Sequence, residues 1–336
     1  MPIVVASEVR NLLEELLKCS GVPAELAEIQ TTVLLEAELR GVASHGILRT
    51  PRILKRIGNG VTNPVTTGRH SWRASAFLEV DGERGLGPVV ASHAIDAIAE
   101  RASTTGVAVA AISNSNHVGM LAWYAERVAR RGQTLIGFST SEALVHPWGG
   151  GTAMIGTNPI TIGVPTENGP FVMDTATSIV SMGKIHDYAN RGQPIPEGWG
   201  VDAHGAASTD PVAVKSGAIS PFGGAKGYAL GLAFELLVSS LTNAALGRDV
   251  RGTLDDTEPC NKGDLFIVID GATGAVGAYL EAIRTLPPSP GFEEVRVPGD
   301  RALATREERL ANGIPVGAEI WSELLQIAED TLPKEN

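Results

Sequence analysis

The feature of this 336-residue chain that most limits its fold is an alternation of short β-rich runs with helical segments, which begins near residue 76. The runs VAVAAIS, TLIGFSTS, PITIGVP, FVMDT and DLFIVID are bounded by Gly, Pro or Asn, as strands usually are. Helical spacing of apolar residues occupies 88–104, 119–131 and 228–246, the last expected to be a buried helix. A final strand is expected at 293–299, before two closing helices at 304–313 and 322–332. This order predicts an α/β core with a mixed sheet.

Two helical patterns precede this alternation. Apolar residues recur at helical spacing through residues 7–42, and Gly21-Val22-Pro23 divides them as a stop followed by a start. A third helix is expected from Ser44 to Gly58-Asn59-Gly60, and the closing helices are expected to pack back on these opening ones. We therefore divide the chain into a helical layer, residues 1–75 with 280–336, and an α/β core, residues 76–279, which together form one discontinuous unit.

The charge and the cysteines limit the partners and the compartment. The formal net charge is −11 and the pI is about 5.2, whereas nucleic acids and anionic membranes recruit dense Lys/Arg patches, which this sequence lacks. Cys19 and Cys260 form neither a CxxC pair nor a disulfide framework. We therefore expect a cytoplasmic globular protein with no nucleic-acid or membrane partner.

The common motifs for phosphate, metal and nucleophile sites are absent from the sequence. No G-x-G-x-x-G follows a strand and no G-x-x-x-x-G-K-[ST] occurs, so a standard Rossmann or P-loop site is excluded. HExxH, paired Cys/His spacing and a G-x-S-x-G elbow are also missing, so we expect neither a bound metal nor hydrolase chemistry. The 39 glycines concentrate in loops such as HPWGGGTAMIGTNP and SPFGGAKGYA, where the backbone can approach a ligand closely.

The segment GVASHGILRTPR groups one imidazole and two guanidiniums. His45 and Arg49 are four residues apart, and Arg49 and Arg52 are three apart, a spacing that puts them on one face of a helix. Arg pairs bidentately with planar anions, so this face would clamp the carboxylate of an acidic substrate if it lined a cleft. The alternative is a solvated helix face on which His45 is a cap.

His117 in AISNSNHVGM stands where an apolar run gives way to a helix, and active-site groups concentrate at such turns. Its imidazole has an ordinary pKa near 6.5, so it can give or take a proton at neutral pH, as carbonyl reduction and alcohol oxidation both require. The alternative is a capping or surface histidine.

Three further clusters each follow an apolar element or precede a helix. Ser141 and Glu142 follow one strand, Asp174-Thr175-Ala176 end another, and Lys226 stands beside flexible glycines before a helix. Asp174 could accept hydrogen bonds from a ribose or amide, and Lys226 could meet a phosphate or carboxylate. Each also has an ordinary alternative, since Asp174 could cap a turn and Lys226 could be a solvated lysine.

Eight segments occur in an order typical of one known family. In chain order they are SHGILRTPR, SNHVGM, HPWGG, GTNPITIGVP, FVMDTATS, MGKI, PFGGAKGYALGLAFELL and GFEEVRVPGDR. Over essentially its whole length the chain resembles the malate/L-lactate dehydrogenase family that is unrelated to the Rossmann-type lactate and malate enzymes. That family includes sulfolactate and ureidoglycolate dehydrogenases and piperideine-2-carboxylate/pyrroline-2-carboxylate reductases.

This resemblance implies a non-Rossmann NAD(P)-binding fold, NAD or NADP as the cofactor, and usually a homodimer. It also implies that His117 is the proton donor or acceptor and that His45 and Arg49 lie at the substrate, with Ser44 and Arg52 as further substrate contacts. The implied cofactor-binding residues are Ser141, Asp174, Thr175, Ala176, Lys226, Pro298, Gly299 and Asp300.

The expected reaction is therefore the interconversion of a small 2-hydroxy acid and its 2-oxo acid by hydride transfer. Arg49 would orient the 1-carboxylate while His117 protonates the developing alkoxide. Arg52 or a neighbouring cation would hold a second acidic group, which favours malate or 3-sulfolactate over lactate.

Other functions stay open at this point. The family's cyclic imine reductases share several motifs but tend to carry a second His near SNHVG, where this chain has Asn116. Ureidoglycolate oxidation is a further alternative. A protein that binds a small carboxylate without catalysis is the alternative of another class.

Overall fold

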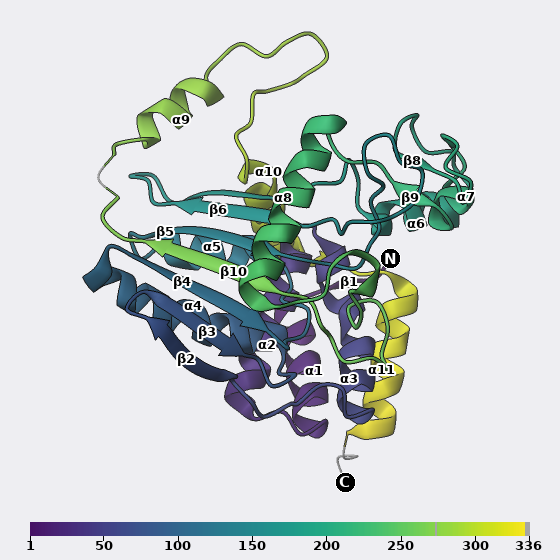
Figure 1. Ribbon diagram of the computed structural model, residues 1–336. Coiled ribbons are helices and arrows are strands. Elements are labelled where there is room, and N and C mark those ends of the chain that lie inside the picture. Colours follow the sequence, from purple (N-terminus) through teal and green to yellow (C-terminus); the bar gives the residue numbers. More distant parts are fainter. Residues whose placement is uncertain (273, 333–336) are drawn as a thin grey trace.

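The computed structural model describes residues 1–272 and 274–332, so residues 333–336 of the predicted helical layer, and residue 273 of the predicted core, lie outside the described residues. A seven-stranded sheet occupies the middle of the molecule and helices lie on both of its faces (Figure 1). This arrangement confirms the predicted α/β fold with a mixed sheet core.

The sheet joins strands that are far apart in the sequence. Its spatial order is β2 (Arg69–Ala74), β3 (Phe77–Asp81), β4 (Val107–Ser113), β10 (Asp264–Ile269), β5 (Thr134–Ser139), β6 (Ile160–Val164) and β7 (Phe171–Thr175). β3 and β4 are parallel, and every other neighbouring pair is antiparallel. The carboxyl ends of β4, β5 and β7 therefore meet at one edge of the sheet, where β6 and β10 begin. We call this the functional edge.

Two short strand pairs lie outside this sheet. They are β1 (Ile3–Val4) with β11 (Ile314–Pro315), and β8 (Gly200–Val201) with β9 (Ala218–Ile219). The helices are α1 (Ala6–Cys19), α2 (Ala24–Leu39), α3 (Thr50–Gly58), α4 (Gly87–Thr105), α5 (Leu121–Ala129), α6 (Met182–Asn190), α7 (Pro211–Lys215), α8 (Ala225–Thr242), α9 (Gly277–Arg284), α10 (Asp300–Asn312) and α11 (Ala318–Thr331).

The two faces of the sheet bury different sets of side chains because strand residues alternate in direction. Along β4, Ala110 and Ile112 face α4 and α5 and join a cluster with Ile95 and Tyr124. Ala111 faces the other way and packs with Val238 of α8. The core of the molecule therefore lies on both sides of β4, β10 and β5.

α8 is not the fully buried helix expected from its apolar sequence. Only one side of it faces the sheet, through residues such as Gly231, Glu235 and Val238. On its other side Leu230 and Leu236 are 43% and 51% exposed. A helix that is apolar on every side can pack on the sheet through any of its faces. Its sequence therefore does not show whether the helix is buried on one side or completely.

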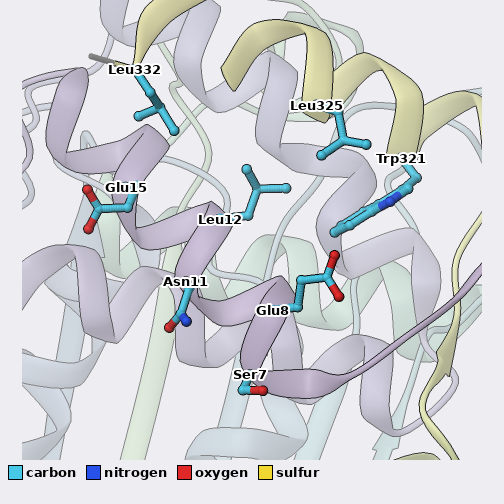
Figure 2. A pocket seen from close by; sticks show the side chains of 8 residues that line it. All are labelled: Ser7, Glu8, Asn11, Leu12, Glu15, Trp321, Leu325 and Leu332. Atoms are coloured by element: carbon cyan, nitrogen blue, oxygen red, sulfur yellow. The ribbon is translucent and has the colours of Figure 1, made fainter. Parts of the chain in front are cut away.

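The first and last helices of the chain pack together, as predicted. Leu13, Leu16, Trp321 and Leu324 belong to one buried cluster that joins α1 to α11. A groove of about 470 Å³ runs between the same two helices and is lined by Leu12, Trp321 and Leu325 among others (Figure 2). None of the predicted site residues lines this groove.

The secondary structure differs from the sequence expectations at four points. β2 and β3 were not predicted. β2 is exposed along its whole length and its sequence, RHSWRA, carries no apolar alternation, whereas β3, FLEVD, does alternate. β2 also lies in the segment assigned to the helical layer, so the sheet begins before residue 76. The third helix begins at Thr50 rather than Ser44. No strand forms at 293–299, where Pro298 removes a backbone donor that a ladder would use.

Candidate active site

The turn between β4 and α5 carries His117 to the functional edge. Gly119 has φ +76°, a left-handed conformation that a side chain would strain, and a Cβ there would meet Val33 Cγ1 at 2.5 Å. The backbone N–H of Gly119 donates to His117 Nδ1 at 3.2 Å, which holds the ring in one orientation. Nε2 is therefore the ring nitrogen that is left for a ligand.

Asn116, directly before His117, fixes this turn with all of its side-chain hydrogen-bonding capacity. Its Nδ2 donates to the carbonyls of Arg84 and Gly85 at 2.7 and 2.8 Å. Its Oδ1 accepts from Arg56 Nε at 3.1 Å and from Thr62 Oγ1 at 3.2 Å. A buried amide with four good partners leaves its neighbour in the chain little freedom to move.

The segment that carries His45 and Arg49 is not one helix. It forms two short 3₁₀ turns, Ala43–His45 and Ile47–Arg49, separated by Gly46 in an extended conformation. A Cβ at Gly46 would lie 2.1 Å from Glu38 Oε1, which accepts the backbone N–H of Ile47 at 3.0 Å. The predicted single helix face for His45, Arg49 and Arg52 was therefore wrong, because tertiary contact with α2 breaks the helix at Gly46.

The two segments nevertheless bring the predicted catalytic side chains together. The rings of His45 and His117 lie 5.2 Å apart between centroids. Ser44 Oγ is 2.9 Å from His45 Nδ1, and Arg49 Nε donates to the Ser44 carbonyl at 2.8 Å. Ser44 is thus hydrogen-bonded to both His45 and Arg49.

A small cavity of about 40 Å³ lies beside His117. Its lining comes from α2, α3, the turn before α5 and the loop near 252, and includes Arg49, Arg52, Arg56, Asn116, His117 and Thr253. Among the described residues that line it there are three guanidiniums and no carboxylate. A concave site of this charge favours an anion.

Burial and these cations keep both imidazoles neutral. Burial, and next the charge of Arg49, lower the pKa of His117 well below 6.5. The same two causes lower the pKa of His45 to about 4. Burial and the charge of Arg52 lower the pKa of Arg49 to about 10, so this guanidinium stays charged at neutral pH. The cavity therefore combines fixed positive charge with neutral imidazole.

A loop around residues 252–255, which sequence reasoning did not single out, closes one side of the cavity. Glu142 Oε1 accepts from the backbone N–H groups of Thr253 and Leu254 and from the Thr253 hydroxyl, at 2.8–2.9 Å. Arg49 Nη1 donates to the Thr253 carbonyl at 3.3 Å, and Arg56 Nη1 donates to the Asp255 carbonyl at 3.0 Å. Of the residues that fix this loop from outside the helical layer, the sequence pattern indicated Glu142, because it follows β5.

Apart from Pro298-Gly299-Asp300, the predicted cofactor-binding residues also gather at the functional edge. Ser141 Oγ accepts from Thr157 N at 3.0 Å, Thr177 N donates to the Thr157 carbonyl at 2.8 Å, and Phe222 N donates to the Thr177 carbonyl at 3.0 Å. These contacts put Ser141, the end of β7 with Asp174, Thr175 and Ala176, and the start of α8 with Lys226 next to one another. Pro298-Gly299-Asp300 lies apart from them, against the beginning of β7, since a Cβ on Gly299 would be 3.0 Å from the Val172 carbonyl.

Asp174 links the predicted cofactor-binding residues to the turn that carries His117. Asp174 Oδ2 accepts from Ala122 N, at the start of the helix that follows His117, at 2.7 Å. Asp300, in contrast, is tied to Arg284 by two hydrogen bonds of 3.0 and 2.8 Å. Asp300 therefore stabilises its own loop.

The start of α8 suits a phosphate group. Gly223 and Gly224 have φ of +57° and +62°, and the exposed Lys226 follows them in the first turn of the helix. The helix N-terminus adds partial positive charge and free N–H groups. The nearby GTNP loop is fixed by the buried Glu235, which accepts from Asn158 Nδ2 at 2.6 Å and Gly156 N at 3.1 Å. The residues present thus fit a dinucleotide.

Two searches of the described residues gave negative results. Within 1–272 and 274–332, no group of three or more His, Cys, Asp or Glu side chains is arranged to hold a metal ion. Over the same ranges, no helix has the length and apolar character needed to cross a membrane.

Known proteins define the class to which this fold and site belong. The sequence profile described as malate/L-lactate dehydrogenase matches residues 4–325, so the chain belongs to the malate/L-lactate dehydrogenase family. L-sulfolactate dehydrogenase of Methanocaldococcus jannaschii is 34% identical over 329 residues, which cover 96% of this chain and 95% of that protein. A solved dehydrogenase from Sinorhizobium meliloti is 51% identical with a TM-score of 0.93, covering 97% of this chain and 98% of that one.

Members of the family differ in substrate and cofactor. The solved Δ1-piperideine-2-carboxylate reductase of Pseudomonas syringae has a TM-score of 0.85 and 29% identity, covering 98% of this chain and all of that one. Relatives at 34% and 31% identity are named (2R)-3-sulfolactate dehydrogenase (NADP(+)) in Chromohalobacter salexigens and ureidoglycolate dehydrogenase (NAD(+)) in Escherichia coli O157:H7. The predicted family and its enzyme class are confirmed.

Proposed function

We propose that this protein is an NAD(P)-dependent oxidoreductase that interconverts a small 2-hydroxy acid, of the malate, 3-sulfolactate or lactate type, with its 2-oxo acid. The observation that carries the proposal is the small cavity that is lined by His117 together with three arginines. A 2-hydroxy acid presents both an anion and an oxygen that must exchange a proton, and this lining offers a partner for each.

The cofactor is NAD or NADP, held by Ser141, Asp174, Thr175, Ala176, Lys226 and the turn Pro298-Gly299-Asp300. When bound, it exchanges a hydride with carbon 2 of the substrate. The ammonium of Lys226 and the N-terminus of α8 stabilise phosphate charge. Asp174, with one oxygen on Ala122 N, keeps a second oxygen for a hydroxyl or amide donor.

The residues of the chain supply orientation and proton transfer. Arg49 binds the 1-carboxylate, with Ser44 and Arg52 at its side, and His45 packs against His117 so that the reacting oxygen lies at His117 Nε2. In oxidation His117 accepts the hydroxyl proton at Nε2, which requires the neutral ring to carry its own proton on Nδ1 and to give up the contact of that nitrogen with the Gly119 N–H. In reduction the bound anion offsets the nearby guanidinium charge and raises the pKa of His117, which allows the ring to carry and deliver a proton.

Spectrophotometry tests this proposal directly. Wild-type protein with NADH and NADPH would be screened against pyruvate, oxaloacetate, sulfopyruvate, a ureido-oxo acid and piperideine-2-carboxylate, by loss of reduced nicotinamide. We expect turnover of at least one 2-oxo acid, and loss of that turnover with retained substrate binding in His117→Ala. Turnover of the cyclic imine alone would select the imine-reductase alternative, while ligand binding without turnover of any compound would select the carboxylate-binding alternative.

The proposal includes a homodimer, as the family resemblance implies. The exposed face of α8 supports it, because Leu230, Leu236 and Leu237 are 43%, 51% and 40% exposed on one helix. An apolar face of this kind favours association with a second copy. Light scattering should give a dimer for wild type and a monomer for Leu236→Lys, and a monomeric wild type at micromolar concentration would contradict the dimer. A cytoplasmic location stays a prediction of the cysteine pattern.

A further inference from the structure

Arg56, which the sequence analysis did not single out, is one of the residues that line the cavity beside His117, and it has an unused donor. It lies in α3 and is 5% exposed. Its Nε donates to Asn116 Oδ1 at 3.1 Å and its Nη1 donates to the Asp255 carbonyl at 3.0 Å. Its Nη2 is buried and has no hydrogen-bond partner among the described residues. A buried charged donor without a partner is costly, so an unfilled position of this kind indicates a ligand.

The acidic group nearest to Arg56 does not fill that position. Asp255 Oδ1 lies 3.8 Å from Nη1, beyond hydrogen-bond range, and the Asp255 carboxylate instead accepts the backbone N–H groups of Gly252, Thr257 and Glu258. The described lining of the cavity contains no carboxylate. Asp255 therefore forms a long ion pair with Nη1, whereas Nη2 keeps an unused donor for an anion that enters from solution.

Arg56 and Arg52 differ in how ready they are to bind that anion. The side chain of Arg52 is partly exposed and makes no hydrogen bond within the described residues, so water screens its charge and its rotamers stay free. Arg56 is held by two hydrogen bonds and is shielded from water. A pre-ordered, desolvated guanidinium binds an acidic group at lower entropic cost and with stronger attraction.

We propose that Arg56 binds the second acidic group of the substrate, a carboxylate or sulfonate, through Nη2 and thereby selects dianionic 2-hydroxy acids over monoanionic ones. This inference rests on the proposed function. It assigns to Arg56 the role that the sequence analysis left to Arg52 or a neighbouring cation. The hydrogen bond to Asn116 sets a fixed spacing between the group that holds the distal anion and the imidazole that handles the proton.

The test compares two four-carbon substrates, malate and 2-hydroxybutyrate, which carry two and one acidic groups. In Arg56→Met we expect the ratio of kcat/KM for malate to that for 2-hydroxybutyrate to fall by roughly 30- to 1000-fold, because loss of the hydrogen bond to Asn116 affects both substrates alike. Lys55→Met is the matched control, because Lys55 is an exposed cation beside Arg56 on the same helix. This control should leave the ratio of the two values unchanged. Equal losses on both substrates would show a purely structural role through Asn116, and no loss on malate would show no role; either result overturns the proposal.

Binding measured without turnover separates this inference from the proposed function. Calorimetric titration of wild-type and Arg56→Met protein with malate and with 2-hydroxybutyrate should show a loss of affinity confined to malate, again of roughly 30-fold or more. If wild type turns over no 2-hydroxy or 2-oxo acid with either cofactor, the proposed function fails, yet this titration still decides whether Arg56 holds the distal anion. Unchanged malate affinity in Arg56→Met would overturn the inference even in an active enzyme.

Discussion

Replacing Glu38 with Gln should alter the way in which the stability of this protein depends on pH. Glu38 is 4% exposed, at the end of α2, and its Oε1 accepts the backbone N–H of Ile47 at 3.0 Å. That contact holds the segment from His45 to Arg49. Burial raises the pKa of Glu38 from 4.5 to about 7, against the opposing effects of the Ile47 N–H and the charge of Arg309. Gln keeps a carbonyl oxygen for Ile47 and removes the titration.

The pKa shift gives the size of the effect. The folded state holds the Glu38 proton between about pH 4.5 and 7 while the unfolded chain has released it, so stability falls as the pH rises through that window. The difference of 7 − 4.5 = 2.5 units corresponds to about 3 kcal/mol in total. Most of this falls between roughly pH 5 and pH 8. Relative to wild type, Glu38→Gln should therefore gain that much in free energy of unfolding across the same interval.

Urea unfolding at a series of pH values measures this difference directly. Glu28→Gln is the matched control, because Glu28 is an exposed residue of the same helix and should change the difference by less than about 0.5 kcal/mol. Subtracting wild type from variant removes the contribution of the other titrating groups. A difference between wild type and Glu38→Gln that stays constant from about pH 5 to pH 8 would refute the argument that burial keeps this carboxyl protonated.

Three further outcomes are expected. His117→Asn should lower kcat by about 100-fold or more while KM changes little, as steady-state kinetics will show; a kcat within a few-fold of wild type would remove His117 from proton transfer. Because the pKa of free His117 lies well below 6.5, log kcat/KM for oxidation should show no loss attributable to this group as the pH falls from about 8 to 6.5, and an inflection above 6.5 would contradict it. Gly46→Ala should cost roughly 2–4 kcal/mol in unfolding free energy, since its Cβ would lie 2.1 Å from Glu38 Oε1, and Gly58→Ala, with open space around the Cβ, should cost far less.

Local sequence patterns were sufficient to predict the strands and helices that have regular apolar periodicity. The five β-rich runs all became strands, and both closing helices formed. Apolar periodicity indicates the buried face of α11, where Trp321, Leu324 and Ala328 are buried, whereas α10 has no buried residue. The same reasoning failed where contact with another part of the chain outweighs periodicity. Gly46 breaks the expected third helix because Glu38 of α2 occupies the space of its Cβ, and β2 joins the sheet although all of its residues are exposed.

The candidate site divides in the same way between sequence and tertiary structure. The sequence alone determined the residue types that chemistry requires, a histidine after a strand, arginines at helical spacing and a glycine-rich turn before a lysine, together with the family to which their order belongs. Only the tertiary structure decided that the ends of β4, β5 and β7 share one edge, and that Arg56, Glu142 and Thr253 join His117 there. The physical reason is that a buried guanidinium with an unfilled donor arises from packing between segments about 200 residues apart, and no local spacing encodes that burial.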